Sequence, residues 1–235
     1  MANKITFFGH SAFFIETDKG CTIWIDPWLE NPMAPNAIPE NAMTPDLVLI
    51  THAHGDHLGN CDKLAQSAAT EVVAIHEIQQ YLLAKGVPNS TGMNIGGTYV
   101  TKDISITMVT AIHSSSIQEE GDMIYGGEAA GFVVKLEDGF TLYHAGDTAL
   151  FGDMVLIGTL YSPDIAMLPI GSHYVMGPQE AAYAAKLLNV PKVIPMHYGS
   201  FPVLTGTVED FAYEIDEMGL NTEIIPLSPG ETYTS

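Results

Sequence analysis

The sequence feature that most constrains the fold is a cluster of three histidines and one aspartate within six residues: His52, His54, Asp56 and His57. The cluster directly follows a short apolar run, 46–50, which we predict to be a buried strand because turn residues bound it. Imidazoles packed this closely would lose solvation and, when protonated, would repel one another. A divalent cation removes both costs, because neutral imidazole and carboxylate ligate zinc, iron and manganese.

The spacing within this cluster favours two adjacent metal ions over one. His52 and His54 alternate along an extended backbone, so their side chains point to the same side. Asp56 and His57 come after Gly55, where the chain can turn. The alternative, a run of solvated surface histidines, fits poorly because the cluster ends an apolar strand instead of lying in a polar tail.

Length and charge limit the class of protein. The 235 residues are 46% hydrophobic, which predicts one domain, 1–235, with a substantial core. The chain has 8 basic and 28 acidic residues, a formal net charge of −20, and every basic residue is a lysine. Nucleic-acid partners and anionic membranes are disfavoured because both require clusters of basic side chains. The lack of arginine also removes the bidentate fork that commonly binds phosphate.

Cysteine usage and the termini predict a soluble cytoplasmic protein. Cys21 and Cys61 lack CxxC spacing, so we expect two free, mostly buried thiols in a reducing compartment, and we disfavour Cys61 as a metal ligand. The first residues lack the apolar core of a signal peptide. No window approaches the ~20 apolar residues of a membrane span. The expected partner is a small-molecule substrate, and assembly into a homo-oligomer stays open.

Polar residues recur at the ends of apolar runs along the whole chain. The predicted strands and the residues that follow them are 104–112 with His113, 140–144 with Asp147, 164–168 with His173 and 192–196 with His197. Early strands form a meander and later strands alternate with helices, which predicts two sheets covered by helices with their loops converging along one edge. We also predict a helix over 60–69 and a mobile loop over 114–129.

The order of these residues resembles a known family. His52-x-His54-x-Asp56-His57, followed by His113, Gly146-Asp147 and His197, is similar to the five-part signature of the metallo-β-lactamase superfamily. Finer motifs resemble one branch, the uncharacterised metal-dependent hydrolases related to the ascorbate-6-phosphate lactonase: Gly9-His10-Ser11, Asp26-Pro27-Trp28, and the segments 169–173 and 196–202. The resemblance covers nearly the whole chain and implies an α/β fold, a four-layer αββα sandwich with the site at one edge.

The resemblance also implies a ligand set for two divalent metal ions. His52, His54 and His113 would hold the first ion, Asp56, His57 and His197 the second, and Asp147 would bridge them. Zinc is the expected metal, with manganese, iron and nickel as alternatives, because a His/Asp set accepts all four. Asp56 and Asp147 are expected to take part in catalysis as well as in binding the metals.

Four other residues have competing interpretations. Asp26 either accepts a hydrogen bond from a metal-bound imidazole or is only a turn residue before proline. His173 is a candidate for the acid that protonates the leaving group, or for a substrate contact, against a structural loop role. His10 either lines the pocket or is structural. His144 lies inside a predicted strand, so we expect a core histidine with its hydrogen bonds satisfied.

The predicted function is that of a dinuclear metal-dependent hydrolase, in which a metal-bridging hydroxide attacks a small ester, lactone or related substrate. One alternative is a metal-dependent phosphodiesterase, which the lack of arginine disfavours. Another is a non-hydrolytic redox module on the same fold; such relatives usually carry an additional flavin-type domain, for which 235 residues leave no room. A binding protein that has lost catalysis is disfavoured because the ligand set is complete.

Overall fold

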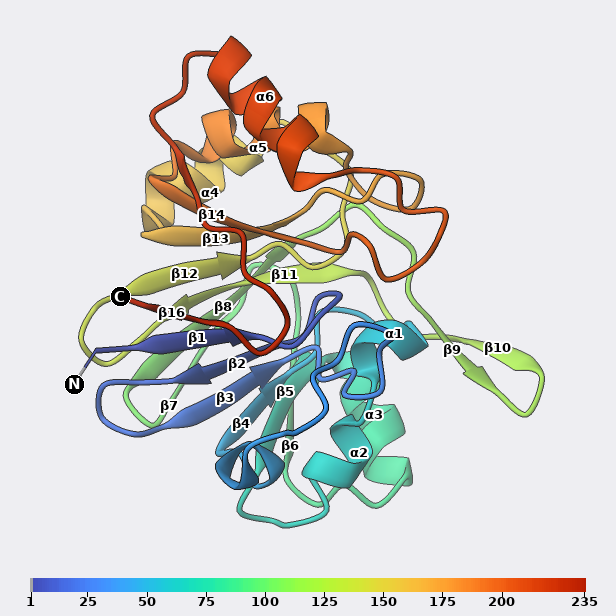
Figure 1. Ribbon diagram of the computed structural model, residues 1–235. Helices are drawn as coiled ribbons and strands as arrows, with labels where there is room; N and C mark the ends of the chain where they lie inside the picture. Colours follow the sequence, from blue (N-terminus) through green and yellow to red (C-terminus); the bar gives the residue numbers. More distant parts are fainter. Residues whose placement is uncertain (1) are drawn as a thin grey trace.

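Two seven-stranded sheets form the centre of the molecule, in a computed structural model that describes residues 2–235 (Figure 1). The first sheet has the strand order β16 (Thr232–Thr234), β1 (Lys4–Phe7), β2 (Phe13–Glu16), β3 (Thr22–Ile25), β4 (Leu47–Leu49), β5 (Glu71–Ile75) and β6 (Ser90–Met93). The second has the order β15 (Glu223–Ile224), β14 (Lys192–Met196), β13 (Ile165–Pro169), β12 (Thr141–His144), β11 (Ala130–Lys135), β8 (Ile104–Thr110) and β7 (Thr98–Thr101).

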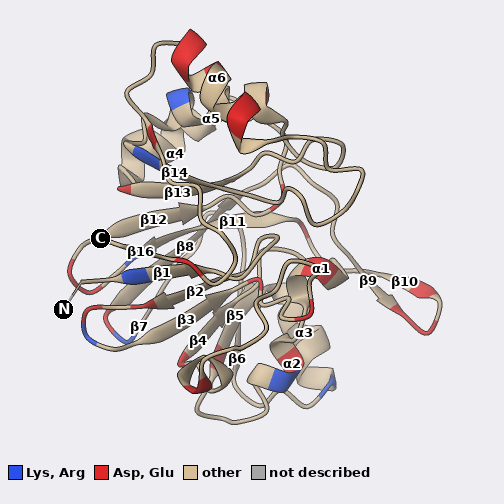
Figure 2. Cartoon of the chain, in the orientation of Figure 1, with Lys and Arg blue, Asp and Glu red and all other residues tan. Residues whose placement is uncertain are grey.

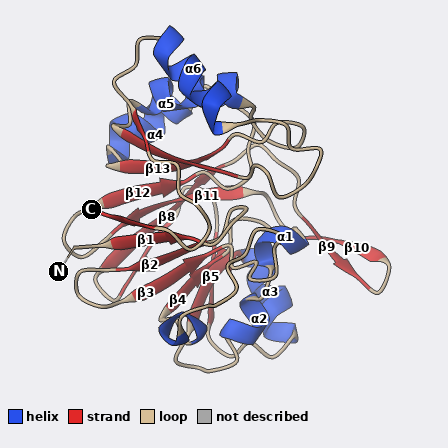
Figure 3. Cartoon of the chain, in the orientation of Figure 1, coloured by secondary structure: helices blue, strands red, loops and turns tan. Residues whose placement is uncertain are grey.

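Helices cover the outer faces of both sheets (Figure 3). The helices on the first sheet are α1 (Gly55–Leu58), α2 (Cys61–Leu64) and α3 (His76–Ala84), and those on the second are α4 (Met154–Tyr161), α5 (Pro178–Leu188) and α6 (Val208–Glu217). A short 3-10 helix spans Glu40–Met43. This is the four-layer αββα arrangement that the sequence predicts.

The alternation of side chains along the strands produces two apolar layers. In β11, Phe132 and Val134 are buried in the core between the sheets, together with Phe13 of the first sheet, whose ring packs against His144. Val133, between them in the sequence, points to the other side and packs in the layer beneath α4, α5 and α6. The second sheet is therefore apolar on both faces, as expected for a sheet with helices on one side and another sheet on the other.

Two local predictions were wrong. The helix predicted over 60–69 is only α2, which ends at Leu64: the Asn60 side chain accepts a hydrogen bond from the backbone N–H of Leu29 at 2.9 Å and does not cap the helix. The segment predicted as a mobile loop, 114–129, contains a hairpin of β9 (Ser116–Glu119) and β10 (Asp122–Tyr125). Figure 1 shows this hairpin extending from the body of the molecule beside α1.

The topology explains why chemically active residues from distant parts of the chain meet. Strands β3, β4 and β5 are parallel neighbours in the first sheet, and β12, β13 and β14 are parallel neighbours in the second. The carboxyl ends of parallel strands lie at the same edge of a sheet. The loops that follow β3, β4, β12 and β14 therefore converge at one edge of the sandwich, near α1 and the β9–β10 hairpin (Figure 1).

Candidate metal centre

Three histidines predicted to share one metal form a compact group. His52 and His54 lie between β4 and α1, and His113 follows β8. One ring nitrogen of each lies within 4.8 Å of the others, and His52 Nε2 is 3.0 Å from His54 Nδ1. His52 is fully buried, whereas His54 and His113 are partly exposed, so the group opens to solvent on one side.

A second group contains the residues predicted for the other metal, with one addition. Asp56 and His57 lie in α1, and His197 follows β14. Their ligand atoms lie within 4.8 Å of one another and of a ring nitrogen of His10, which follows β1. The sequence interpretation left His10 open between a pocket position and a structural role; it did not predict a place among ligand-capable atoms.

Asp147 lies between the two groups. Its Oδ2 is 3.0 Å from His197 Nε2, 3.6 Å from His113 Nε2 and 3.9 Å from His52 Nε2, and its Oδ1 is 3.2 Å from His57 Nε2. The carboxylate is almost fully buried. One side chain that follows β12 thus contacts histidines of both groups, which is the position required of a bridging ligand.

The hydrogen-bond inventory supports a fit to metal ions. Within residues 2–235, His57 Nε2, Asp147 Oδ1 and His197 Nδ1 are buried without a hydrogen-bond partner. Buried polar atoms in native proteins nearly always have a partner, because an unsatisfied one costs about 1–3 kcal/mol. Two of these atoms, His57 Nε2 and Asp147 Oδ1, face each other 3.2 Å apart, which fits a pair of side chains that share a metal ion.

Asp26 orients one of these imidazoles. Its Oδ2 is 2.7 Å from His57 Nδ1, on the opposite side of the ring from Asp147. Thr51 donates to the same carboxylate twice, from its backbone N–H to Oδ1 at 2.8 Å and from its hydroxyl to Oδ2 at 2.6 Å. Of the two interpretations of Asp26, the structure therefore supports the hydrogen bond to an imidazole, which fixes the ring orientation and tautomer of a ligand.

His10 joins Asp56 to the body of the protein. Its Nδ1 is 2.6 Å from the Ser200 hydroxyl and its Nε2 is 3.2 Å from Asp56 Oδ2. Burial is the main reason that the pKa of His10 falls to about 4. At neutral pH the ring is therefore neutral, and the consistent tautomer carries its proton on Nε2, donates to Asp56 and accepts from Ser200.

Most imidazoles of the centre are in the protonation state that a metal requires. Burial lowers the pKa of His52, His54 and His113 below the usual value, so these rings are neutral at neutral pH. Burial would also lower the pKa of His57, but the carboxylates of Asp147 and Asp26 outweigh it and raise that pKa. His57 is therefore the ring that would lose a proton on metal binding, because a cation between His57 and Asp147 would take the place of that proton.

The backbone is strained at three of these positions. His10, Asp26 and His197 have φ values of 55°, 49° and 54°, in the left-handed region that side chains with a Cβ rarely adopt. The backbone N–H of His197 donates to the His10 carbonyl at 2.7 Å, which ties two of them together. Such strain persists where the surrounding structure fixes the residue, and it is common at functional sites.

His173 is not part of either group. It lies on the exposed segment between β13 and α5, where its ring packs edge-on against Tyr174 with centroids 4.5 Å apart. No cluster of metal-capable side chains found in residues 2–235 includes it. Its predicted role as the acid that protonates the leaving group has no contact to support it and stays a prediction.

Two further expectations concern buried side chains. His144 is a core histidine, as expected: its Nε2 donates to the Ser11 carbonyl at 3.1 Å, and its Nδ1 accepts from the Gly146 backbone at 3.1 Å. Cys21 and Cys61 are free thiols, and neither belongs to a metal-capable cluster in the part of the chain that the structure describes.

Comparison with known proteins agrees with this fold and site. Residues 4–197 match the family described as the β-lactamase superfamily domain. A metallo hydrolase from the archaeon Ignicoccus hospitalis superposes with a TM-score of 0.87 at 38% identity, covering 100% of this chain and 99% of that one. The predicted metallo-β-lactamase-like αββα fold is thereby confirmed.

Curated relatives narrow the assignment. A UPF0173 metal-dependent hydrolase from Rubrobacter xylanophilus is 49% identical over 97% of this chain and 95% of its own length. Another, from Methanopyrus kandleri, is 48% identical over 98% of this chain and 99% of its own length. The chain belongs to the metallo-β-lactamase superfamily and, within it, to the UPF0173 metal-dependent hydrolases. It is a metal-dependent hydrolase, as predicted.

The search for membrane-crossing helices gave a negative result: within residues 2–235, none is both long enough and apolar enough.

Proposed function

We propose that this hydrolase binds two divalent metal ions and cleaves a small, uncharged ester or lactone. His52, His54 and His113 would hold one ion, Asp56, His57 and His197 the other, and Asp147 would contact both. Zinc suits this nitrogen and oxygen donor set, as do manganese, iron and nickel. Two ions so held would supply a water acidified towards neutral pH and would polarise the substrate carbonyl.

One observation carries the proposal: a single buried carboxylate, Asp147, lies within 4 Å of histidines from two separate groups. A site for one ion needs only one group of three side chains. Two such groups that meet at one carboxylate, with unpartnered buried atoms on His57 and Asp147, match the needs of two neighbouring metal ions.

The remaining residues of the centre position these groups. Asp26 fixes the ring of His57, and Thr51 fixes Asp26. His10 fixes one oxygen of Asp56, whose side chain is 27% exposed and forms part of the border between the buried centre and solvent. Positioning of this kind lets the reacting groups meet without a reorganisation cost during the reaction.

Charge supports an uncharged ester or lactone over a phosphorylated substrate. The chain carries a net charge of −20 and no arginine, so anions are repelled at long range and no guanidinium is available to bind a phosphate. The same argument supports a small-molecule substrate over a nucleic acid. The two free cysteines support action in a reducing compartment such as the cytoplasm.

The test is a substrate panel with metal analysis of the purified protein. Lactones, nitrophenyl esters and bis-nitrophenyl phosphate are offered to the metal-replete protein, to the protein treated with a chelator, and to a His54→Ala variant. We expect hydrolysis of lactones or esters by the metal-replete protein, and loss of both activity and metal in the other two samples. Preferential cleavage of the phosphodiester would overturn the choice of substrate, and an active, metal-replete His54→Ala variant would overturn the site.

A further inference from the structure

A cavity of about 770 Å³ opens directly beside the metal centre. The metal-centre residues that line it are His54 and Asp56, both of which are partly exposed. Opposite them, the β9–β10 hairpin contributes Ile117, Gln118 and Met123. A substrate bound at the metals therefore has open space beside it, between α1 and the hairpin.

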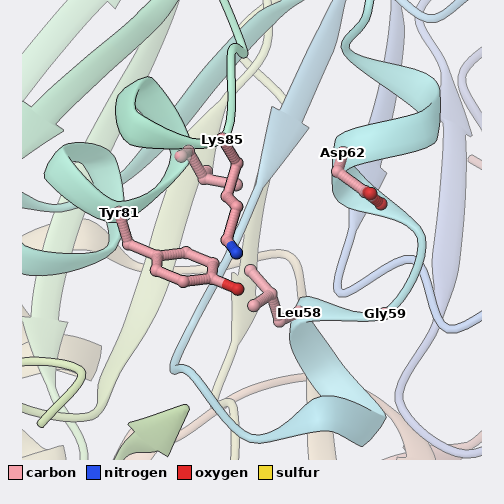
Figure 4. Close-up of a pocket in the computed structure, with 6 residues that line it drawn as sticks. Leu58, Gly59, Asp62, Tyr81 and Lys85 are labelled. Atoms are coloured by element: carbon pink, nitrogen blue, oxygen red, sulfur yellow. The ribbon is translucent and has the colours of Figure 1, made fainter. Parts of the chain in front are cut away.

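A smaller cavity of about 270 Å³ continues this space along α3. The two cavities share Leu58 and Tyr81 and are therefore adjacent; together they are called the groove below. Figure 4 shows the Tyr81 hydroxyl and the Lys85 amine pointing towards Leu58 in the smaller cavity. Besides these groups, the smaller cavity is bordered by Asp62.

The charges around the groove exclude an anionic substrate group. Among the described residues that line the groove, Lys85 is the single cation. Its Nζ is already paired with Glu119 of the hairpin and lies 5.3 Å from the Tyr81 ring centroid. Asp56 and Asp62 also line the groove, and Figure 2 shows red segments in α1 and at the tip of the hairpin, with no blue segment in either. The hairpin carries three acidic residues in sequence order, Glu119, Glu120 and Asp122. An anion would thus meet net negative charge.

The hairpin instead offers apolar surface. Met123 is 77% exposed and lines the cavity beside the apolar side chain of Leu58. Flexible methionine side chains adapt to apolar ligands of varied shape. The amide of Gln118 adds a neutral hydrogen-bonding group.

Resting on the proposed function, we infer that the groove between α1, α3 and the β9–β10 hairpin binds an uncharged, apolar acyl chain of the substrate. The scissile carbonyl would lie at the metal centre, next to His54 and Asp56, and the chain would extend past Met123 towards Leu58 and Tyr81. The preferred substrate is then a neutral ester or lactone with an apolar substituent of several carbons.

The first test compares nitrophenyl acetate, butanoate and hexanoate with the matched adipate monoester, which ends in a carboxylate. We expect kcat/KM to rise about threefold for each added methylene, because apolar surface leaves water, and to fall for the adipate monoester. A kcat/KM that does not change from acetate to hexanoate would overturn the inference while leaving the proposed function intact. A preference for the adipate monoester would overturn both the inference and the choice of an uncharged substrate.

Variants locate the effect. Met123→Glu adds a negative charge to an exposed groove position, and we expect the hexanoate-to-acetate ratio of kcat/KM to fall about tenfold, since a charged group opposes an apolar chain. The matched control is Val155→Glu, at a half-exposed position on α4 that lines neither cavity. Its ratio should stay within about twofold of the unmodified protein. Equal ratios in both variants would contradict the assignment of the groove.

A binding measurement separates this inference from the proposed function. The protein is labelled with ¹³C at methionine methyl groups and titrated with N-propylhexanamide, N-propylacetamide or adipate. The Met123 methyl resonance, assigned with Met123→Leu, should shift with the hexanamide and not with the other two. The shift is expected even if the protein cleaves no ester, because it reports binding alone. A resonance that does not respond to the hexanamide would refute the groove as an acyl-chain site.

Discussion

At the scale of single residues, the account depends on Asp147. The sequence predicted all seven ligand candidates through the resemblance to the metallo-β-lactamase signature, and their positions after apolar strands agree with it. The structure brings them together as two groups around this carboxylate. Their roles as ligands stay predictions until metal is measured. His10 was harder to place from sequence, since its proximity to Asp56 depends on contacts with Ser200 and His197 from the far end of the chain.

Replacing Asp147 with asparagine should abolish activity and lower the metal content well below two ions per chain. The amide keeps the shape but removes the negative charge that faces four histidines. Elemental analysis after desalting measures the effect. Asp216→Asn, an exposed change on α6, is the control and should retain both ions. Full metal content in Asp147→Asn would show that this carboxylate is not shared.

Asp26→Asn should weaken metal binding by about 10–100-fold without unfolding the protein, because Asp26 orients His57 and is not itself in the predicted ligand set. Competition with a chromophoric chelator gives the affinity, and circular dichroism reports the fold. An unchanged affinity would assign Asp26 a purely structural role in holding Thr51.

At the scale of elements, short loops place the site, and glycine permits their geometry. Gly146, just before Asp147, has φ +61°, and an added Cβ would lie 2.7 Å from the Ala130 carbonyl and 2.9 Å from Thr51 Cβ. The sequence shows the glycine but cannot show this close approach. The contact brings together three segments that are far apart in the sequence: the residues after β12, the start of β11, and Thr51 just before His52.

Gly146→Ala should therefore lower the stability by about 1–3 kcal/mol and lower metal content by displacing Asp147. Gly219→Ala is a matched control: its φ is +62°, but an added Cβ would meet nothing within 4 Å. Denaturant melts and elemental analysis of both variants separate backbone strain from displacement. Equal effects in both would argue that Gly146 is needed only for its φ.

The residues at the starts of α6 and α2 show when helix-capping preference decides the local structure and when a tertiary contact overrides it. Threonine is a residue type that favours helix starts, and the Thr207 hydroxyl accepts from the Asp210 backbone N–H at 3.1 Å at the start of α6. Asn60 has the same propensity, but a tertiary contact to Leu29 takes up its side chain. Propensity cannot foresee such competition.

Thr207→Ala should cost about 1 kcal/mol of stability, because one N–H of the first turn loses its partner. Thr207→Ser should recover most of it. Metal content should remain that of the unmodified protein, since α6 packs on α5 and away from the centre. A melting temperature unchanged in Thr207→Ala would show that this cap does not contribute.

At the scale of the whole molecule, the centre joins the two halves of the sandwich. The first sheet and α1 supply His52, His54, Asp56 and His57, and the loops of the second sheet supply the remaining ligand candidates. Sequence predicted the layers because strand and helix periodicities are local. It missed β6, β16 and the β9–β10 hairpin, which depend on pairing with other segments.

Removal of metal should destabilise the whole fold. Each ion that binds only the folded state adds about 2.7 kcal/mol at a concentration 100 times Kd, which corresponds to about 5–10 °C in melting temperature per ion for a chain of this size. Scanning calorimetry before and after chelation, with excess zinc added back, measures this. A melting temperature that does not respond would contradict metal binding across the two halves.

The most direct test of the account is a crystal structure of the purified protein with anomalous diffraction at the absorption edge of the metal found by elemental analysis. The account predicts two anomalous peaks, one among His52, His54 and His113 and one among Asp56, His57 and His197, with Asp147 bound to both. A single peak, or two peaks without Asp147 between them, would contradict it.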